Sequence, residues 1–217
     1  MEFILMGIKE RKEREKERRR HQIMVAAKRV FSAKGFSKTT IEDIAREAEL
    51  SPGTLYLYFK NKDDLYASLS LGILQYLLIR LEHLNSEKKM NPGQKFELLK
   101  NIMYDVYEFD PLILINMFHL HSSENLKNLS PQLIAKIRKL LHKTLKAIAI
   151  IFSEGMDKKF FIKKNPSTFA GLTWAMFGGI VLFNESKRII DNEKNQLKQS
   201  LENGFEVLGR GIKDDMI

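Results

Sequence analysis

The chain contains 217 residues, of which 44% are hydrophobic and 29% charged, a composition that supports a folded core and excludes a disordered chain. It has no cysteine, which excludes disulfides, thiol catalysis and thiolate zinc sites. Its apolar runs are short, so we expect no membrane-spanning helix, which needs roughly 20 apolar residues. No signal-peptide cleavage site follows the apolar start, and we expect a cytoplasmic protein with Met1 or Met6 as the initiator.

Charge is distributed unevenly along the chain, whose formal net charge is +9. Residues 1–62 hold 15 Lys and Arg against 9 Asp and Glu, whereas residues 63–217 hold 21 against 18. A basic N-terminal segment on a nearly balanced body indicates a polyanionic partner for that segment. The alternative is a solvated helix surface with many ion pairs, and charge alone does not separate the two.

The periodicity of the apolar residues predicts an all-α protein of about nine helices, with no competing strand-like alternation. We expect the helices over residues 9–35, 41–49, 51–59, 62–84, 92–109, 111–121, 131–155, 166–187 and 192–212. Gly35 ends the first helix, Thr39 and Thr40 are good N-caps for the second, and Ser51 followed by Pro52 begins the third.

The three short helices within residues 23–59 have the spacing of a helix-turn-helix, with residues 49–51 as the turn. A recognition helix must let its N-terminal backbone approach DNA, and the third helix begins with the small residues Pro52, Gly53 and Thr54. We expect Leu55 and Phe59, four residues apart, to fix this helix to the core. The side chains that project differently are Tyr56 and Tyr58, whose hydroxyls can reach phosphates, and Lys60 and Lys62 follow them.

A dense set of residues then matches a known pattern: Ile23, Ala26, Ala27, Val30, Phe31, Gly35, Phe36, Thr39, Thr40, Asp43, Ile44, Ala45, Ala48, Leu50, Ser51, Gly53, Thr54, Leu55, Tyr56, Tyr58, Phe59, Lys62 and Leu65. This pattern resembles the N-terminal domain of tetracycline-repressor (TetR) type transcription regulators. The resemblance implies a helix-turn-helix DNA-binding domain over residues 9–62 and a helical ligand-binding and dimerisation domain over residues 63–217.

The same resemblance implies roles for individual residues. Thr40 would cap the second helix and contact a phosphate, while Ser51, Pro52 and Gly53 would face base edges in the major groove. The backbone phosphates would be bound by Thr54, Tyr56, Tyr58 and Lys62, with Lys60 as a further DNA-binding residue.

Two residues depart from the family pattern. Glu49 stands where many members have glycine, and a left-handed backbone there would cost about 1 kcal/mol relative to glycine. Leu57 replaces a polar or aromatic residue; it would either contact a thymine methyl group or pack, and we favour packing. The charged run before the domain is expected to be an exposed helix extension over residues 9–17, whereas Arg18–Arg20 are expected to lie near DNA.

The C-terminal body supplies two further predictions. The eighth helix is apolar nearly all round and needs covering on both sides, which favours a homodimer over a monomer. The resemblance places the dimer interface on the last two helices, at Phe169, Met176, Ile180, Leu197, Leu201, Phe205 and Leu208. It also implies a pocket for a hydrophobic small-molecule effector, lined by Met103, Tyr107, Phe118, His121, Trp174 and Phe177.

Other chemistry lacks the residues it needs. His119 and His121 are two apart and point in different directions on a helix, so we expect no metal site. No nucleophile constellation or phosphate loop is present, so we expect no enzyme and no cofactor; the pair Gly178–Gly179 is expected to permit close helix packing. The predicted function is a ligand-responsive repressor that binds a palindromic DNA operator as a dimer. The alternative is a helical interaction module whose basic end binds a membrane surface or a protein.

Overall fold

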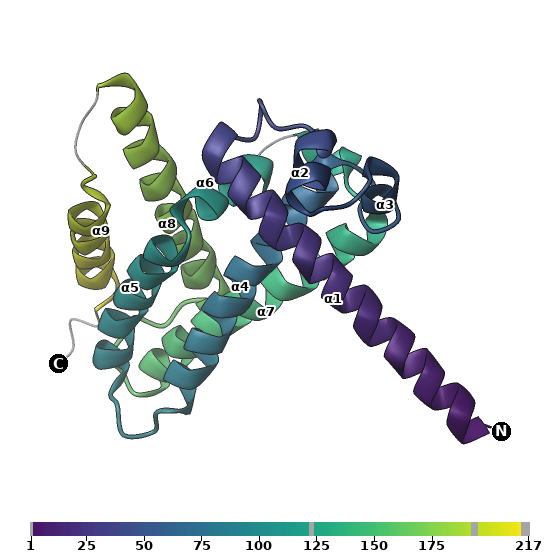
Figure 1. Ribbon diagram of the computed structural model, residues 1–217. Coiled ribbons are helices and arrows are strands. Elements are labelled where there is room, and N and C mark those ends of the chain that lie inside the picture. Colours follow the sequence, from purple (N-terminus) through teal and green to yellow (C-terminus); the bar gives the residue numbers. More distant parts are fainter. Residues whose placement is uncertain (1, 122–123, 192–194, 214–217) are drawn as a thin grey trace. The chain divides into compact units, whose positions relative to one another are not determined.

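The computed structural model describes residues 2–121, 124–191 and 195–213, and within these ranges the fold is helical (Figure 1). The helices are α1 (Glu2–Lys34), α2 (Ile41–Glu47), α3 (Pro52–Tyr56), α4 (Lys62–Ser86), α5 (Pro92–Phe109), α6 (Pro111–His121), α7 (Pro131–Asp157), α8 (Pro166–Ile190) and α9 (Leu197–Ile212). A 3₁₀ helix, η1 (Glu124–Asn128), precedes α7, and one isolated antiparallel bridge joins Phe161 to Lys213. The predicted all-α class is confirmed.

The chain divides into two compact units that differ from a simple split along the sequence. The first unit comprises residues 1–69 together with residues 124–134, and the second comprises residues 70–123 and 135–217. The predicted domains, residues 9–62 and 63–217, divide the chain at one point, whereas the first unit also recruits a segment from between α6 and α7.

The first unit is built around α1, α2, α3 and the start of α4. Its core is made of apolar side chains at helical spacing: Ile23, Ala26, Ala27, Val30, Phe31, Ile41, Ile44, Ala45, Leu55 and Phe59. Phe31 packs edge to face against Tyr66 with ring centroids 4.7 Å apart. Gly35 follows α1 and ends it, as predicted. Its φ of +75° is a left-handed conformation, which glycine adopts at little cost and which stops the helix.

The second unit has an aromatic core in which Phe96 contacts Phe152, Phe161 and Phe205, with ring centroids 5.2–6.0 Å apart. A Cβ atom at Gly155 would lie 2.0 Å from the Phe161 ring, so only glycine fits at this crossing. Ile162 donates to the carbonyl of Ile212 at 2.9 Å, which ties the loop before α8 to the end of α9.

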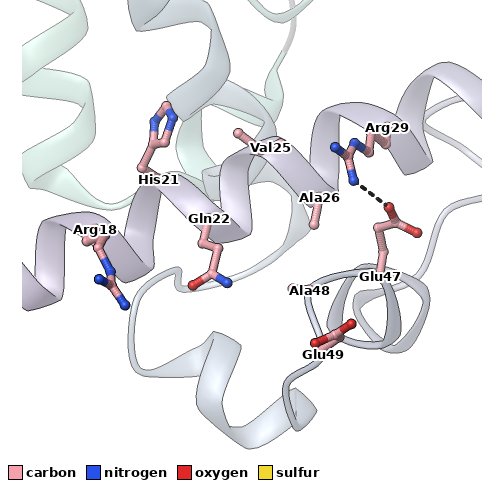
Figure 2. A pocket seen from close by; sticks show the side chains of 9 residues that line it. All are labelled: Arg18, His21, Gln22, Val25, Ala26, Arg29, Glu47, Ala48 and Glu49. Carbon is pink, nitrogen blue, oxygen red and sulfur yellow. Dashed lines mark hydrogen bonds and ion pairs between the residues drawn. The ribbon is translucent and has the colours of Figure 1, made fainter.

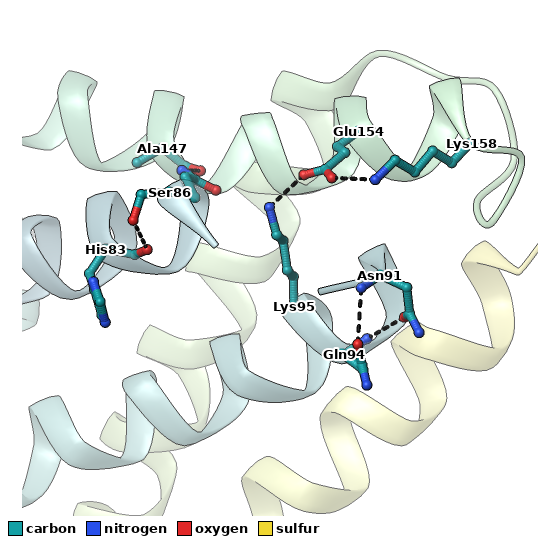
Figure 3. A network of polar contacts seen from close by, with 9 residues as sticks. His83, Ser86, Asn91, Gln94, Lys95, Ala147, Glu154 and Lys158 are labelled. Carbon is teal, nitrogen blue, oxygen red and sulfur yellow. Dashed lines mark hydrogen bonds and ion pairs between the residues drawn. The ribbon is translucent and has the colours of Figure 1, made fainter. Parts of the chain in front are cut away.

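A buried lysine belongs to the same region (Figure 3). The side chain of Lys95 is 2% exposed, and its ammonium lies 2.7 Å from Glu154, which also pairs with Lys158 at 2.7 Å. Hydrogen bonds from Lys158 and from Lys95 hold the pKa of Glu154 below its ordinary value. A buried ammonium needs such a partner, so Glu154 fixes the start of α5 against the end of α7.

One expectation about membranes needs a correction. Among the described helices, α8 is long and apolar enough, by length and composition, to cross a membrane. Counting uninterrupted apolar runs missed this property, because the apolar residues of α8 are interspersed with Gly, Thr and Ser. The core helices of globular proteins meet the same criterion, so α8 alone is weak evidence for a membrane protein.

Candidate nucleic-acid interface

The start of α3 combines a firm N-cap with very little side-chain bulk. The Ser51 hydroxyl accepts a hydrogen bond from the Thr54 amide at 3.2 Å, and the two hydroxyls lie 2.9 Å apart. Pro52 occupies the first turn, where its missing N–H costs nothing. Gly53 is exposed, and a Cβ atom there would meet only the Ser51 hydroxyl, at 3.8 Å. The predicted cap is confirmed, and the backbone at this end of α3 is open to close approach.

Local chemistry fixes the start of α2, and a left-handed residue forms the turn after it. Thr40 caps α2 in a reciprocal capping box with Asp43, as the sequence predicted for the cap. A hydrogen bond from Lys34, followed by one from the Thr40 backbone, keeps the pKa of Asp43 below its ordinary value. Glu49 has φ +55°, so the residue that replaces the family's glycine is indeed left-handed.

The outward side chains of α3 differ sharply in exposure from the inward ones. Leu55 and Phe59 are 1% and 2% exposed and anchor the helix, as predicted. Tyr56 is 55% exposed and Tyr58 is half-buried. Leu57, predicted to pack, is 79% exposed; it follows the last turn of α3, where no other element covers it among the described residues.

The two predicted lysines both have partners inside the protein. The Lys62 ammonium donates to the carbonyls of Phe36 and Thr39, at 2.9 Å each, and lies 4.4 Å from the centre of the Phe36 ring. The Lys60 ammonium donates to the carbonyl of Asn128 at 3.1 Å. These bonds leave one hydrogen on Lys62 and two on Lys60 for a phosphate.

The basic run at the start of the domain, residues 9–20, contains two kinds of residue. Arg20 donates to the Tyr58 carbonyl at 3.0 Å and the Ser68 hydroxyl at 2.9 Å, and its guanidinium lies 4.3 Å from the centre of the Phe59 ring. Arg20 therefore holds the end of the α3 region to α1 and α4. Residues 10–17 are exposed, which agrees with the expected helix extension. Arg18 is exposed as well, and the expected position of Arg18–Arg20 near DNA stays a prediction.

A surface groove of about 500 Å³ lies between α1 and the turn (Figure 2). It is lined by Arg18, His21, Gln22, Val25, Ala26, Arg29, Glu47, Ala48 and Glu49. Arg29 and Glu47 form an ion pair across it at 3.3 Å. Because two carboxylates line the groove beside two arginines, it is poorly suited to bind a phosphate by itself.

The sequence analysis did not identify the segment 128–130, which packs against the start of α4 next to the helix-turn-helix. The Asp64 carboxylate, 4% exposed, accepts from the Ser130 amide at 2.8 Å and from the Lys60 amide at 3.4 Å. Asn61 donates to the Asn128 carbonyl at 3.1 Å. These contacts fasten residues 128–130 to the start of α4. No local pattern predicts such a long-range contact, apart from a buried aspartate that needs donors.

Three of the six predicted effector residues, Phe118, Trp174 and Phe177, form a packed aromatic cluster in the second unit. Phe118 contacts Trp174 and Phe177, with ring centroids 5.3 and 5.6 Å apart, and a Cβ atom at Gly178 would meet the Phe118 ring at 2.9 Å. This confirms the close packing expected at Gly178. Met103 is fully buried, whereas the His121 side chain lies outside the described residues.

The cavity described in this unit does not coincide with the predicted effector residues. Burial raises the pKa of the Tyr107 hydroxyl, which accepts a hydrogen bond from Asn195 at 3.1 Å. A cavity of about 200 Å³ in this unit is lined by residues of α4, α5 and the loop between them, and the five placed effector residues do not line it. Among the described side chains, no group of three His, Asp or Glu is placed to hold a metal ion.

The predicted dimer-interface residues fall into two sets. Phe169, Leu197, Leu201 and Phe205 are at most 8% exposed within their own chain, so they belong to the core of the protomer. Met176, Ile180 and Leu208 are partly exposed. The large apolar side chains that remain exposed are Leu172, Phe183, Ile189 and Ile190 on α8 and Val207 on α9, with exposed fractions from 52% to 75%. Spacing predicted the apolar stripes but not which stripe faces inward.

Comparisons with known proteins agree with this geometry. Residues 23–69 match the family described as "Bacterial regulatory proteins, tetR family". An uncharacterized HTH-type transcriptional regulator of Haemophilus influenzae is 33% identical over 108 residues, which are 50% of this chain and 57% of that protein. The fatty acid metabolism regulator protein of Bacillus subtilis is 29% identical over 137 residues, 63% of this chain and 67% of that protein.

A solved structure extends the likeness to most of the chain. The transcriptional regulator FadR from Bacillus subtilis, in complex with stearoyl-CoA, superposes with a TM-score of 0.65 and 25% identity. The superposition covers 88% of this chain and 98% of that one. At the helix-turn-helix, residues 23–69, the chain is similar to the tetR family of bacterial regulatory proteins, and over most of its length it shares the fold of a solved transcriptional regulator.

Proposed function

We propose that the protein is a ligand-responsive transcription regulator, most simply a repressor, that binds a palindromic DNA operator as a homodimer in the cytoplasm. The observation that carries the proposal is the exposed, capped and nearly side-chain-free start of α3. It has the shape that a recognition helix needs to enter the major groove with its N-terminus. The relatives that match this region carry names of transcriptional regulators, which supports a binding protein over an enzyme.

Within this proposal, Ser51, Pro52 and Gly53 face base edges, and Leu57 presents an apolar group to a thymine methyl. Thr40, Thr54, Tyr56 and Tyr58 contact phosphates, and Lys60 and Lys62 supply their remaining hydrogens to phosphates while holding the domain together. Base contacts give sequence preference, whereas phosphate contacts set register and salt dependence.

The proposed dimer uses the outward faces of α8 and α9. Leu172, Met176, Gly179 and Phe183 follow one another at four- and three-residue spacing, so they form one stripe along α8, and Val207 is exposed on α9. Exposed apolar surface of this kind is costly in a monomer. Leu172→Glu with Phe183→Glu should convert a species of twice the 25.3 kDa chain mass into a monomer in sedimentation. The equally exposed Ile79→Glu should leave the dimer intact; a monomeric parent protein would contradict the proposal.

The proposed effector is a hydrophobic molecule, with acyl compounds as the first candidates. The support is the aromatic cluster of Phe118, Trp174 and Phe177, together with the stearoyl-CoA bound by the similar FadR of Bacillus subtilis. Because the cluster is packed, a ligand must displace Phe118 or its neighbours. A ligand that binds there should shift the fluorescence of Trp174, the only tryptophan, and lower operator affinity in the same concentration range. A fluorescence change without loss of DNA affinity would contradict the effector role.

The decisive experiment is selection of bound duplexes from random DNA. We expect a palindromic consensus whose half-sites are about one helical turn, or roughly 34 Å, apart. Tyr56→Phe should then weaken binding to all sequences alike, because it removes a phosphate contact. Recovery of no consensus, together with binding to anionic vesicles, would instead support the alternative of a helical interaction module.

A further inference from the structure

The outer face of α7 carries an uninterrupted basic surface, separate from the helix-turn-helix. Between residues 125 and 153 the chain has no Asp or Glu. Lys136, Lys139, Lys143 and Lys146 recur at three- and four-residue spacing, so they form one row along the helix. Arg138 and His142 flank the row. We call these six residues the α7 basic row, and all six are exposed.

The row accounts for the charge of the C-terminal part of the chain. Residues 131–153 hold five Lys and Arg and no acids, whereas the rest of residues 63–217 hold 16 against 18. None of the ion pairs among the described residues involves a member of the row. The positive charge is therefore concentrated and unneutralised on this helix.

This arrangement opposes the stability of the helix, so it calls for another explanation. Like charges three or four residues apart repel one another on a helix surface. The row lies in the middle of α7, which spans Pro131–Asp157, away from the last turn where the helix dipole would stabilise cations. An anionic partner would remove the repulsion.

The geometry points to the phosphate backbone of double-stranded DNA as this partner, and we propose the α7 basic row as a second, sequence-independent DNA-binding surface. The row runs over eleven residues, from Lys136 to Lys146, and the ten steps between them cover about 15 Å at 1.5 Å per residue. One DNA strand presents a phosphate about every 3.4 Å along the axis, so the four lysines span roughly four phosphates. The apolar face of α7 is already buried, through Leu133, Ile137, Thr144, Ile148 and Ile151, so the helix has no apolar face to insert into a membrane.

The test compares two triple variants of the full chain that lose the same charge. Lys139→Gln/Lys143→Gln/Lys146→Gln alters the row, and Lys88→Gln/Lys163→Gln/Lys164→Gln alters exposed lysines elsewhere. Binding to a fluorescent duplex of random sequence is measured at several salt concentrations. The slope of log affinity against log salt should become shallower by about 2–3 in the row variant, at roughly 0.9 per lost phosphate contact, and by less than 1 in the control.

Folding is monitored by circular dichroism, and the row variant should unfold at no lower temperature than the parent because it loses like-charge repulsion. The single variant Lys143→Gln, with a change of about 0.9 in slope, provides a second measurement on a milder substitution. Equal slopes in the two triple variants would overturn the proposal, as would loss of binding to phosphatidylserine vesicles with an unchanged DNA slope. The proposal does not rest on operator recognition: site selection tests α3, whereas the random duplex tests the α7 basic row.

Discussion

Replacing Lys62 by methionine separates a structural role from a DNA-binding one. Methionine keeps an unbranched apolar stem and removes the ammonium, which bonds two carbonyls of the loop between α1 and α2 and stacks on Phe36. A hydrogen bond from a charged donor contributes about 1.5–3 kcal/mol, and about half of that at a half-buried site such as this one. The contact with the ring adds about 0.5–1 kcal/mol. The two hydrogen bonds and the ring contact together predict a loss of about 2–4 kcal/mol in the free energy of unfolding.

The assay is urea unfolding followed by circular dichroism, with Lys38→Met as the matched control. Lys38 is exposed in the same loop, so its variant loses the same charge and should unfold within about 0.5 kcal/mol of the parent. For a chain of this size the Lys62 variant should also melt roughly 4–10 °C lower. Equal stability of the two variants would refute the structural role. The slope of log DNA affinity against log salt concentration is measured for both variants. A slope that becomes shallower by about 1 for Lys62→Met and not for Lys38→Met would show that the Lys62 ammonium also binds a phosphate.

Three further changes test other features. Gly155→Ala should destabilise the protein by about 1–3 kcal/mol because of the aromatic ring against it, whereas Gly171→Ala, with open space around it, should be neutral or stabilising in thermal unfolding. Ser51→Ala should cost about 1 kcal/mol of stability and also weaken operator binding, measured by anisotropy; stability loss alone would limit Ser51 to capping. The folded-state pKa of Glu154 is lowered, so its stabilisation is present above its ordinary pKa of 4.5 and is lost as pH falls through the folded value. At pH 7, Glu154→Gln should therefore be less stable than the parent, and below pH 4.5 this difference in stability should become smaller. If the stability of the two proteins depends on pH in the same way, that result would argue against the pair with Lys95.

Local chemistry explains why most helix boundaries were predictable. Thr40, Ser51 and Gly35 act within one helical turn of themselves, so their roles follow from residue type and spacing. Helix α5 was predicted over the observed range, from Pro92 to the end of its apolar stripe at Phe109. The start of α1 was placed too late, because residues before 9 precede a run that is charged all round and gives no apolar period to connect them to the helix.

The parts that sequence could not predict depend on distance and direction. Spacing shows that Lys62 and Arg20 are basic and near the recognition helix, but the reach of a long side chain decides whether it faces DNA or a carbonyl. Likewise the apolar stripe of α9 was evident, yet the side chains of Leu201 and Phe205 face their own core. Only tertiary packing determines which stripe is left for a partner.

The discontinuous first unit has a consequence for protein engineering. Exchanging the DNA-binding head of this chain for that of a similar regulator would seem to need one cut, after residue 69 in α4. A hybrid joined there would separate the Asp64 carboxylate from the Ser130 amide and Asn61 from the Asn128 carbonyl, unless the acceptor body supplies matching groups. The transplanted head would then carry a buried, poorly satisfied aspartate. A transferable module therefore consists of residues 1–69 and 124–134 together, which makes the loop between α6 and α7 the second splice site of any such chimera.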